Sequence, residues 1–464
     1  MKSNFLLFIL VFFDWLSAFF TWFFFYYFRK TSIENVEFSV NNSFYIGITF
    51  LPIAWLILYA LQGIYKDVKR LYRLRILINT FSSTLIGSIG IFFVFLLDDN
   101  INSYSQYYYS VLFLFFIHFI LTFFPRIILV SYIVKKIHNR KDGFKTLIIG
   151  GSDKAINIYQ EINNLPKGIG CEFVGFLNIN GVDKLLDEYL PYLGHIDNLE
   201  TVICNYNIEE VIIALESSEH DKLKKIISRL EFADINIKVL PDMYDILSGT
   251  VKMNNIFGAL LINIKSEIMP IWQRVFKRML DIIISLMSLV LLIPVYIILA
   301  ILVKLTSPGP IIFRQDRIGK NGKLFRIVKF RTMFINSEIN GPQLSSSNDS
   351  RITKVGRFMR RSRLDEFLQF YNVLIGEMSL VGPRPERQFF IDKIVEREPQ
   401  FLKLTKVRPG ITSWGQVKYG YAENVDQMID RMKYDLLYLK NRSLSLDFKI
   451  MFYTVLIIFK GTGK

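Results

Sequence analysis

Four long apolar runs occupy the first 140 positions of the chain, separated by short polar stretches. They cover approximately residues 5–28, 44–65, 76–97 and 108–133. Each run is close to the ~20 residues that an α-helix needs to cross the hydrocarbon core of a bilayer. The first run is too long for the apolar part of a signal peptide, and no small-residue cleavage site follows it. The pattern therefore predicts a bundle of four transmembrane helices over residues 1–140.

Charges between the runs predict how this bundle is oriented. The loop after the second run has Lys or Arg at positions 66, 69, 70, 73 and 75, whereas the loop after the third run holds Asp98 and Asp99 and no basic residue. Because basic loops stay on the cytoplasmic side, we expect both ends of the bundle in the cytoplasm, although Arg29 and Lys30 in the first outer loop oppose this. Asp14, inside the first run, is expected to face other helices and serve packing.

From about residue 145 the pattern changes to short β-rich runs that alternate with helical segments. The β-rich runs lie at 146–150, 171–178, 209–215 and 236–240. This alternation predicts a parallel α/β domain over residues 141–265. Its first turn, GGSDKA, is placed like a dinucleotide fingerprint, but Ser152 replaces the glycine that permits close approach of a pyrophosphate. We therefore expect a degenerate Rossmann-like domain without a catalytic role.

A fifth apolar run, residues 279–303, determines where the remainder of the chain lies. Basic residues flank both of its ends: Arg274, Lys277 and Arg278 before it, and Lys304, Arg314 and Arg317 after it. Positive charge on both sides argues that both ends are cytoplasmic. Pro294 in the middle removes a helix hydrogen bond and kinks the helix. We expect a re-entrant helix that enters one leaflet and returns, with Lys277 and Arg278 at the membrane surface; an ordinary fifth span would instead place the remaining residues outside the cell.

Composition supports a membrane protein and limits the chemistry of the second half. Hydrophobic residues make up 51% of the chain and the formal charge is +15, a combination typical of membrane proteins with basic flanks. The basic residues cluster beside apolar runs, so a nucleic-acid partner is not expected. Because no His or Cys follows His220, a His-based triad, a zinc site and a thiolate nucleophile are excluded from the second half.

Carboxylates are therefore the candidate catalytic groups, and one pair stands out. Residues 360–374 have the periodicity of an amphipathic helix with Asp365 in its polar stripe and Glu366 about 100° further round. A bare Asp-Glu pair is usually a solvated surface. Here six Lys or Arg residues lie between 351 and 363, and Arg384 lies in a rigid Pro-Arg-Pro turn, which suggests a clamp for a pyrophosphate.

The basic residues could bind a phosphate or the membrane surface, because basic amphipathic segments also bind anionic lipid headgroups. We expect both uses. Arg357, Arg360 and Arg363 are suited to the membrane surface, whereas a fixed phosphate grip is expected from the residues beside Pro, Gly or β-type positions, namely Lys329, Arg331, Arg384 and Arg408.

At these residues the chain resembles the bacterial sugar transferase family, the polyprenyl-phosphate glycosyl-1-phosphate transferases with a monotopic catalytic domain. The resemblance covers roughly residues 270–464, and the front half looks like the long members that begin capsule, exopolysaccharide or O-antigen synthesis. The motifs that carry it are KR at 277–278 with Asp281, Pro294, SPGP at 307–310, KFRTM at 329–333, DE at 365–366, GPRPE at 382–386, RPG at 408–410, and Asp435 with Tyr438. One departure is Ile293, where the family usually has a Ser before the proline of the re-entrant helix.

The resemblance implies an α-rich catalytic domain over residues 266–464 that acts at the bacterial inner membrane, with this domain and the α/β domain in the cytoplasm. Asp365 would attack the β-phosphorus of a UDP-hexose, most simply of glucose or galactose, and undecaprenyl phosphate would resolve the phosphosugar-aspartate. Glu366, with Asp365, would hold Mg²⁺, and relatives suggest a homodimer. Residues implied in binding the phosphates and the nucleotide are Lys329, Arg331, Arg361, Arg384, Glu386, Arg408 and Asp435.

Two other functions remain as alternatives at this point. A membrane-tethered nucleotide-sugar dehydratase or epimerase would need an intact glycine fingerprint and a Tyr-x-x-x-Lys pair nearby. The matches to that pair, at 26–30, 65–69 and 132–136, all fall beside the membrane runs. A non-enzymatic scaffold or regulator of polysaccharide assembly would leave Asp365 and Glu366 dispensable.

Overall fold

The structure is a computed structural model, and contacts divide the chain into two compact units. The first is built mainly from Met1–Leu223 and the second mainly from Gln273–Lys464. The residues described are 3–93, 104–179, 185–215, 220–230, 235–240, 261–264, 269–335 and 349–460, with single positions at 337, 341 and 343. The domain boundary predicted at 265–266 and the loop with Asp98 and Asp99 lie outside them.

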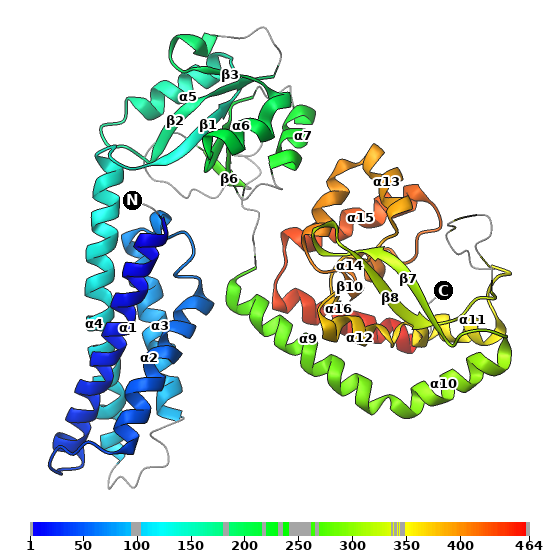
Figure 1. Ribbon diagram of the computed structural model, residues 1–464, viewed down its shortest axis with the longest axis horizontal. Helices are drawn as coiled ribbons and strands as arrows, with labels where there is room; N and C mark the ends of the chain where they lie inside the picture. Colours follow the sequence, from blue (N-terminus) through cyan, green and yellow to red (C-terminus); the bar gives the residue numbers. More distant parts are fainter. Residues whose placement is uncertain are drawn as a thin grey trace. The chain divides into compact units, whose positions relative to one another are not determined.

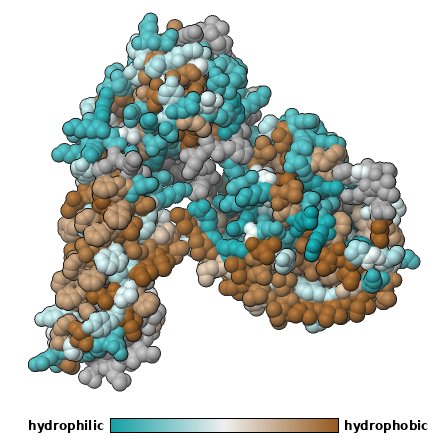
Figure 2. Space-filling model, viewed as in Figure 1, coloured by the Kyte–Doolittle hydropathy of each residue, from teal (hydrophilic) through white to brown (hydrophobic). Residues whose placement is uncertain are grey.

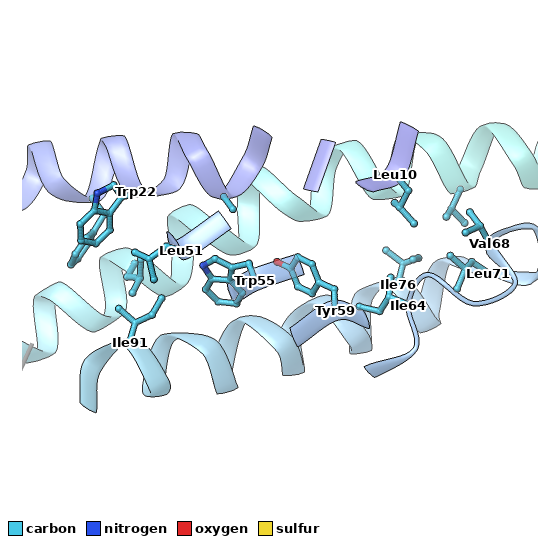
Figure 3. Close-up of a cluster of buried hydrophobic side chains, with 14 of the residues drawn as sticks. Leu10, Trp22, Leu51, Trp55, Tyr59, Ile64, Val68, Leu71, Ile76 and Ile91 are labelled. Atoms are coloured by element: carbon cyan, nitrogen blue, oxygen red, sulfur yellow. The ribbon is translucent and has the colours of Figure 1, made fainter. Parts of the chain in front are cut away.

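Four long helices form the first part of the first unit (Figure 1). They are α1 (Ser3–Phe28), α2 (Asn42–Gln62), α3 (Arg73–Ile91) and α4 (Tyr104–His138). All four are long and apolar enough to cross a membrane, which confirms the four predicted helices. Their shared core includes Trp55 and Tyr59 of α2, which lie between Trp22 and Leu71 along the helices (Figure 3). Many of their other apolar side chains are exposed, as expected of helices whose outer surface meets lipid.

A charged pair lies inside this bundle and is held by several hydrogen bonds. The guanidinium of Arg126 on α4 donates to both carboxylate oxygens of Asp14 on α1, at 2.7 and 2.8 Å. Tyr65 donates to the same carboxylate at 2.9 Å, and Arg126 also donates to Thr80 of α3 at 3.0 Å. A charge in a membrane span is costly unless it is paired and faces the interior. The Asp14–Arg126 pair thus joins α1, α4 and α3, which fits the packing role predicted for Asp14.

The α/β region contains a six-stranded sheet in the order β3-β2-β1-β4-β5-β6. The strands are β1 (Phe144–Ile149), β2 (Cys171–Asn178), β3 (Tyr192–His195), β4 (Glu210–Ile213), β5 (Asn236–Val239) and β6 (Ile262–Ile264), and the helices are α5 (Asp153–Asn163), α6 (Leu199–Tyr206) and α7 (His220–Leu230). All neighbouring strands are parallel except β5 and β6. The predicted α/β fold is therefore confirmed in the strand order of doubly wound folds. The sheet is mixed and not parallel throughout as predicted, because β6 runs antiparallel to β5.

Charged residues join the helical bundle to this sheet. Arg70, in the short helix η2 (Val68–Arg70) after α2, donates to the buried carboxylate of Glu210 at 2.9 Å and lies over the ring of Phe144. Lys238 of β5 forms a second ion pair with Glu210. Lys69 pairs with Asp142 at 3.1 Å. The basic loop that predicted the orientation thus also docks the α/β region.

The second unit is mainly helical, with two small sheets. In chain order its elements are α9 (Ile271–Leu291), α10 (Ile293–Thr306), β7 (Ile312–Ile318), β8 (Leu324–Phe330), α11 (Lys354–Arg361), α12 (Gln369–Ile375), β9 (Ser379–Val381), α13 (Gln388–Arg397), β10 (Gly410–Thr412), α14 (Trp414–Lys418), α15 (Val425–Lys440) and α16 (Leu444–Lys460). β7 and β8 form an antiparallel hairpin, and β9 and β10 are parallel. A core of residues from β8, α12, β9, α15 and α16 joins these elements, including Ile327, Val373 and Tyr438.

Helices α9 and α10 meet at an angle of 61° across a break at Leu292. Pro294 lies in the first turn of α10, so the bend falls where the sequence predicted it. Hydrophobic side chains gather along the outer surface of these two helices (Figure 2). Lys277 donates to the carbonyl of Val381 and to Asp447 of α16, at 2.8 and 2.7 Å. Arg278 donates to two carbonyls at the end of α12, so both residues fasten α9 to the unit.

The single helix predicted over residues 360–374 is wrong, because the chain breaks between α11 and α12. Arg363 has a φ of 59°, in the left-handed region, and a 3₁₀ turn, η8 (Leu364–Glu366), follows it. The predicted polar stripe turns inward: Asn372 accepts from the backbone N–H of Val328 and donates to the carbonyl of Arg326 on β8. Pairing with the edge of β8 therefore fixes α12 independently of α11.

Candidate active site

A pocket of about 570 Å³ lies in the second unit beside the β7–β8 hairpin. Its lining includes both carboxylates of the Asp-Glu pair and a third, Glu386. Eight basic side chains also line it: Arg317, Lys329, Arg331, Arg357, Arg360, Arg384, Arg387 and Arg431. This excess of positive charge suits a ligand with several negative charges, such as a diphosphate.

Asp365 is the carboxylate that has no partner. It is 6% exposed, and among the described residues its side chain has no hydrogen bond or ion pair. The charges of Lys329, Arg360 and Arg363 still act on it and lower its pKa, but by less than burial and Glu366 raise it. Burial, followed by the negative charge of Glu366, raises the pKa of Asp365 to about 6. At neutral pH it is therefore mostly ionised, and its oxygens are available to a ligand in the pocket.

Glu366 is held in place by two arginines. Its carboxylate lies 3.4 Å from Nη1 of Arg363 and 3.7 Å from Nη1 of Arg384. Burial alone would raise the pKa of Glu366, but the charges of Arg363 and Arg384 outweigh it and hold the pKa below its usual value. The two guanidiniums lie 4.5 and 5.7 Å from the centroid of the Tyr421 ring, within cation–π range. Tyr421 thus helps to orient both arginines toward Glu366.

Residues at the end of β8 connect the pocket to α10. Burial, followed by the charge of Arg317, lowers the pKa of Lys329 to about 8. Arg331 donates to the carbonyl and hydroxyl oxygens of Ser307, at 2.7 and 3.0 Å. Gly309 has a φ of +123°, and a Cβ there would lie 2.0 Å from Nη1 of Arg331. The Ser-Pro-Gly-Pro turn after α10 therefore requires its glycine, because side chains rarely adopt this φ and Arg331 packs directly against the turn.

At the other end of the pocket, Glu386 is fixed by ion pairs. It pairs with Arg431 of α15 and lies 3.6 Å from Nη1 of Arg317 on β7. Arg317 also donates to the carbonyl of Pro385 at 3.0 Å. These contacts hold the Pro-Arg-Pro-Glu segment, including Arg384, against the hairpin.

The structure brings together Asp365, Glu366 and four of the seven other predicted ligands: Lys329, Arg331, Arg384 and Glu386. The other three do not line the pocket. Arg361 is exposed on α11, and the exposed Arg408 donates to the carbonyl of Gly376 at 2.9 Å. Asp435 is buried and accepts from the backbone N–H of Gly415 at 2.8 Å; burial raises its pKa to about 6. Its contacts support the α14–α15 packing.

Several lining residues were missed by the sequence analysis. Arg357 and Arg360, expected at the membrane surface, line the pocket. Arg317 could have been found, because the period-two pattern of β7 places it on the same face as Phe313 and Gln315. Tyr421 and Arg431 gave no such signal, since they follow α14 and reach the site only through the tertiary fold.

In the part of the chain that the structure describes, the pocket offers carboxylates but no large cluster of metal ligands. No cluster of three or more His, Cys, Asp or Glu side chains suited to a metal occurs within the described ranges. Mg²⁺ in phosphate-transfer sites commonly uses only one or two carboxylates together with substrate phosphates. The adjacent buried carboxylates of Asp365 and Glu366, in a pocket suited to phosphates, fit this pattern.

Comparisons with known proteins agree with this division of the chain. Residues 272–461 match the family model described as "Bacterial sugar transferase", and residues 55–241 match one described as "CoA-binding domain". The chain is 39% identical over 244 residues to a UDP-N-acetylgalactosamine-undecaprenyl-phosphate N-acetylgalactosaminephosphotransferase of Aeromonas hydrophila, covering 52% of this chain and 56% of that protein.

Two further relatives extend the comparison. The chain is 35% identical over 272 residues to a UDP-glucose:undecaprenyl-phosphate glucose-1-phosphate transferase of Klebsiella pneumoniae, covering 58% of each chain. It is 30% identical over 340 residues to an uncharacterized sugar transferase of Haemophilus influenzae, covering 68% of this chain and 69% of that one. The chain thus spans somewhat more than half the length of the first two relatives.

Proposed function

Because the chain belongs to the bacterial sugar transferase family, we propose that it transfers a sugar 1-phosphate from a UDP-sugar to undecaprenyl phosphate. The observation that carries the proposal is the buried, unpaired carboxylate of Asp365 in a pocket lined by eight basic side chains. Neither a scaffold nor a nucleotide-sugar dehydratase or epimerase requires a carboxylate kept ionised without a partner among so many cations.

In the proposed reaction the Asp365 carboxylate attacks the β-phosphorus of the UDP-sugar. A bond forms between the carboxylate oxygen and phosphorus, and the bond from phosphorus to the bridging oxygen breaks, so that UMP leaves with the electron pair. A phosphate oxygen of undecaprenyl phosphate then attacks the same phosphorus and displaces Asp365. A carboxylate needs no general base for this attack at neutral pH.

The other side chains of the pocket would stabilise the charge of the diphosphate. Arg384 and Lys329 lie beside the carboxylate pair, and fixed cations in a buried site stabilise developing charge more effectively than water does. Asp365 and Glu366 are the residues that would hold Mg²⁺. When bound, Mg²⁺ would neutralise phosphate oxygens and so allow an anion to approach them.

The second unit also offers a way to meet a lipid acceptor. We propose that α9 and α10 form a re-entrant hairpin in the cytoplasmic leaflet of the inner membrane, with the helical bundle spanning it. Their bend of 61° and their exposed apolar side chains, such as Leu305 at 79% exposure, support this. Both flanks are basic, which favours the cytoplasmic side. The soluble donor and the embedded acceptor could then reach one pocket.

The relatives' names indicate which donors to compare. They specify UDP-glucose and UDP-N-acetylgalactosamine, so glucose, galactose and their N-acetylated forms are the donors we propose for this chain. The reaction would begin synthesis of a capsule, exopolysaccharide or O-antigen. A homodimer stays a prediction from the family resemblance.

The test is UMP release by the purified protein with Mg²⁺, undecaprenyl phosphate and each UDP-sugar in turn. We expect one donor to give UMP and a labelled lipid product, and Asp365→Asn to lower the rate by at least ~10³-fold, because the nucleophile is lost. Asp316→Asn is the matched control, since Asp316 is an exposed carboxylate on β7 outside the pocket.

Thermal unfolding separates loss of chemistry from loss of fold. The pKa of Asp365 is raised in the folded protein, so its ionised form opposes folding and its contribution to stability is lost as pH rises through about 6. Asp365→Asn should therefore be at least as stable as the wild type at pH 7. Turnover retained by the folded Asn variant would exclude Asp365 as the nucleophile.

A further inference from the structure

The pocket extends along the β7–β8 hairpin and differs in character at its two ends. Phe313, Gln315 and Arg317 of β7 all line it, and alternate residues along a strand put Phe313 and Arg317 about 13 Å apart. Phe313 pairs across the hairpin with Lys329, whereas Arg317 pairs with Phe325. Arg317 lies beside the ion pair of Glu386 and Arg431. Cations therefore line both ends, and the ends differ in the exposed apolar residues near Phe313.

The Phe313 end is apolar and open. Four residues with no hydrogen-bonding side chain line the pocket here, and we call them the apolar rim: Pro310, Phe313, Phe334 and Ile335. The last three are 41%, 49% and 52% exposed. Large apolar side chains left half-exposed at the mouth of a cationic pocket indicate a ligand or surface that covers them.

The apolar rim continues the exposed surface of α10. The inner side of α10 packs through Leu299 and Val303 against Phe330 of β8, next to the rim. Ile301 and Leu305 on its exposed side are 53% and 79% exposed. The turn from α10 to β7 is closed by Arg331 on Ser307, so the rim begins where the apolar surface of α10 ends.

We propose that the isoprenoid chain of the lipid acceptor crosses the apolar rim, so that its phosphate reaches Asp365 from the Phe313 end while the donor nucleotide occupies the Arg317 end. This rests on the proposed function. An isoprenoid chain has no hydrogen-bonding groups and gains by leaving water for apolar surface. Continuity with α10 gives the chain a path from the leaflet.

The test compares rim variants of the full-length protein with a matched surface variant. Phe313→Gln with Ile335→Gln makes the rim polar, and Ile335→Asn is a milder second variant. Leu324→Gln is the control, because Leu324 is 64% exposed on the same hairpin but does not line the pocket. KM for undecaprenyl phosphate and KM for the UDP-sugar are measured separately in nanodiscs, and thermal unfolding confirms the fold of each variant.

We expect the double variant to raise KM for undecaprenyl phosphate at least ~10-fold and to leave KM for the UDP-sugar within about twofold. A raised KM for the UDP-sugar would place the nucleoside on the rim and overturn the proposal, as would an unchanged acceptor KM in both variants. Absence of UMP release by the wild type with every donor would instead refute the proposed function itself.

Discussion

Two adjacent carboxylates of nearly the same chemistry acquire opposite properties from their surroundings. Glu366 faces Arg363 and Arg384, which keep it ionised and fixed. Asp365 faces the pocket without a partner, and burial beside the charge of Glu366 raises its pKa. When the surroundings shift the pKa values of two neighbouring titratable groups in opposite directions, the two groups commonly have different roles. A positioning role for Glu366 and a chemical role for Asp365 follow from the geometry.

This difference predicts an acid limit to the activity. Asp365 must be ionised to attack phosphorus, and its pKa is raised from 3.8 to about 6. The ionised fraction therefore falls as pH drops through about 6, and kcat/KM for the UDP-sugar should fall roughly tenfold per pH unit below it. A pH profile of initial UMP release between pH 5 and 8 measures this.

The charge of Glu366 provides a control on the assignment of Asp365 as the titrating nucleophile. Glu366→Gln removes a negative charge that raises the pKa of Asp365, so the acid limb of its residual activity should move to lower pH. A flat profile between pH 5 and 7 in the wild type would contradict Asp365 as the titrating nucleophile.

At the residue scale, the sequence motifs predicted the residues around the Asp365–Glu366 pair better than the other residues that line the pocket. Asp365, Glu366, Lys329 and Arg384 lie in short local motifs whose neighbours restrict them. The family resemblance implied Arg361 as a phosphate ligand, and one continuous helix over residues 360–374 would put it one turn from Asp365. The left-handed turn at Arg363 removes that alignment and leaves Arg361 exposed. No local pattern in the sequence predicts a left-handed turn at a residue other than glycine.

At the scale of elements, periodicity predicted the long apolar helices and the central strands, and missed the shortest elements. β3 and β6 have only four and three residues. β4 and β5 also have only four residues each, but both lie within longer β-rich runs of the sequence. β3 contains Gly194 and His195, which have low strand propensity, so pairing with β2 is what makes it a strand. The break between α11 and α12 has the same origin, since contacts of Asn372 with β8 override a continuous helical pattern.

The charged joint between the bundle and the sheet gives a prediction at this scale. Burial alone would raise the pKa of Glu210, but Lys238 and then Arg70 outweigh it and the pKa is lowered. The ionised Glu210 therefore stabilises the folded region at neutral pH. This stabilisation is lost as the pH falls below the usual pKa of a glutamate. Glu210→Gln leaves Lys238 buried without its charge partner, and we expect the α/β region to lose about 3 kcal/mol of stability.

Thermal unfolding and limited proteolysis of the membrane-inserted protein measure this loss. Glu209→Gln is the matched control, because Glu209 is the exposed neighbour of Glu210. The double change Glu210→Leu and Lys238→Met replaces the pair with apolar groups and should recover much of the loss. Equal stability of Glu210→Gln and Glu209→Gln would show that the joint does not stabilise this region.

For the whole molecule, the proposed chemistry depends on which side of the membrane the second unit occupies. An even number of spans in the first unit and a hairpin that returns to its own side would keep the catalytic pocket with the UDP-sugar in the cytoplasm. If α9 and α10 together crossed the membrane, the pocket would lie outside, away from any activated sugar. The bend of 61° is compatible with a broken span as well as with re-entry, so the proposal of re-entry rests on the basic residues at both flanks.

Cysteine accessibility distinguishes these topologies directly. In a background with Cys171 and Cys204 changed to Ser, single cysteines are introduced at Glu37, in the first outer loop, and at the exposed Lys323 of the second unit. A membrane-impermeant maleimide should label position 37 in intact cells and position 323 only after the inner membrane is opened, because re-entry keeps both ends of the α9–α10 pair on the cytoplasmic side. Labelling of position 323 in intact cells would show that α9 and α10 cross the membrane, and the pocket could then not use a cytoplasmic UDP-sugar.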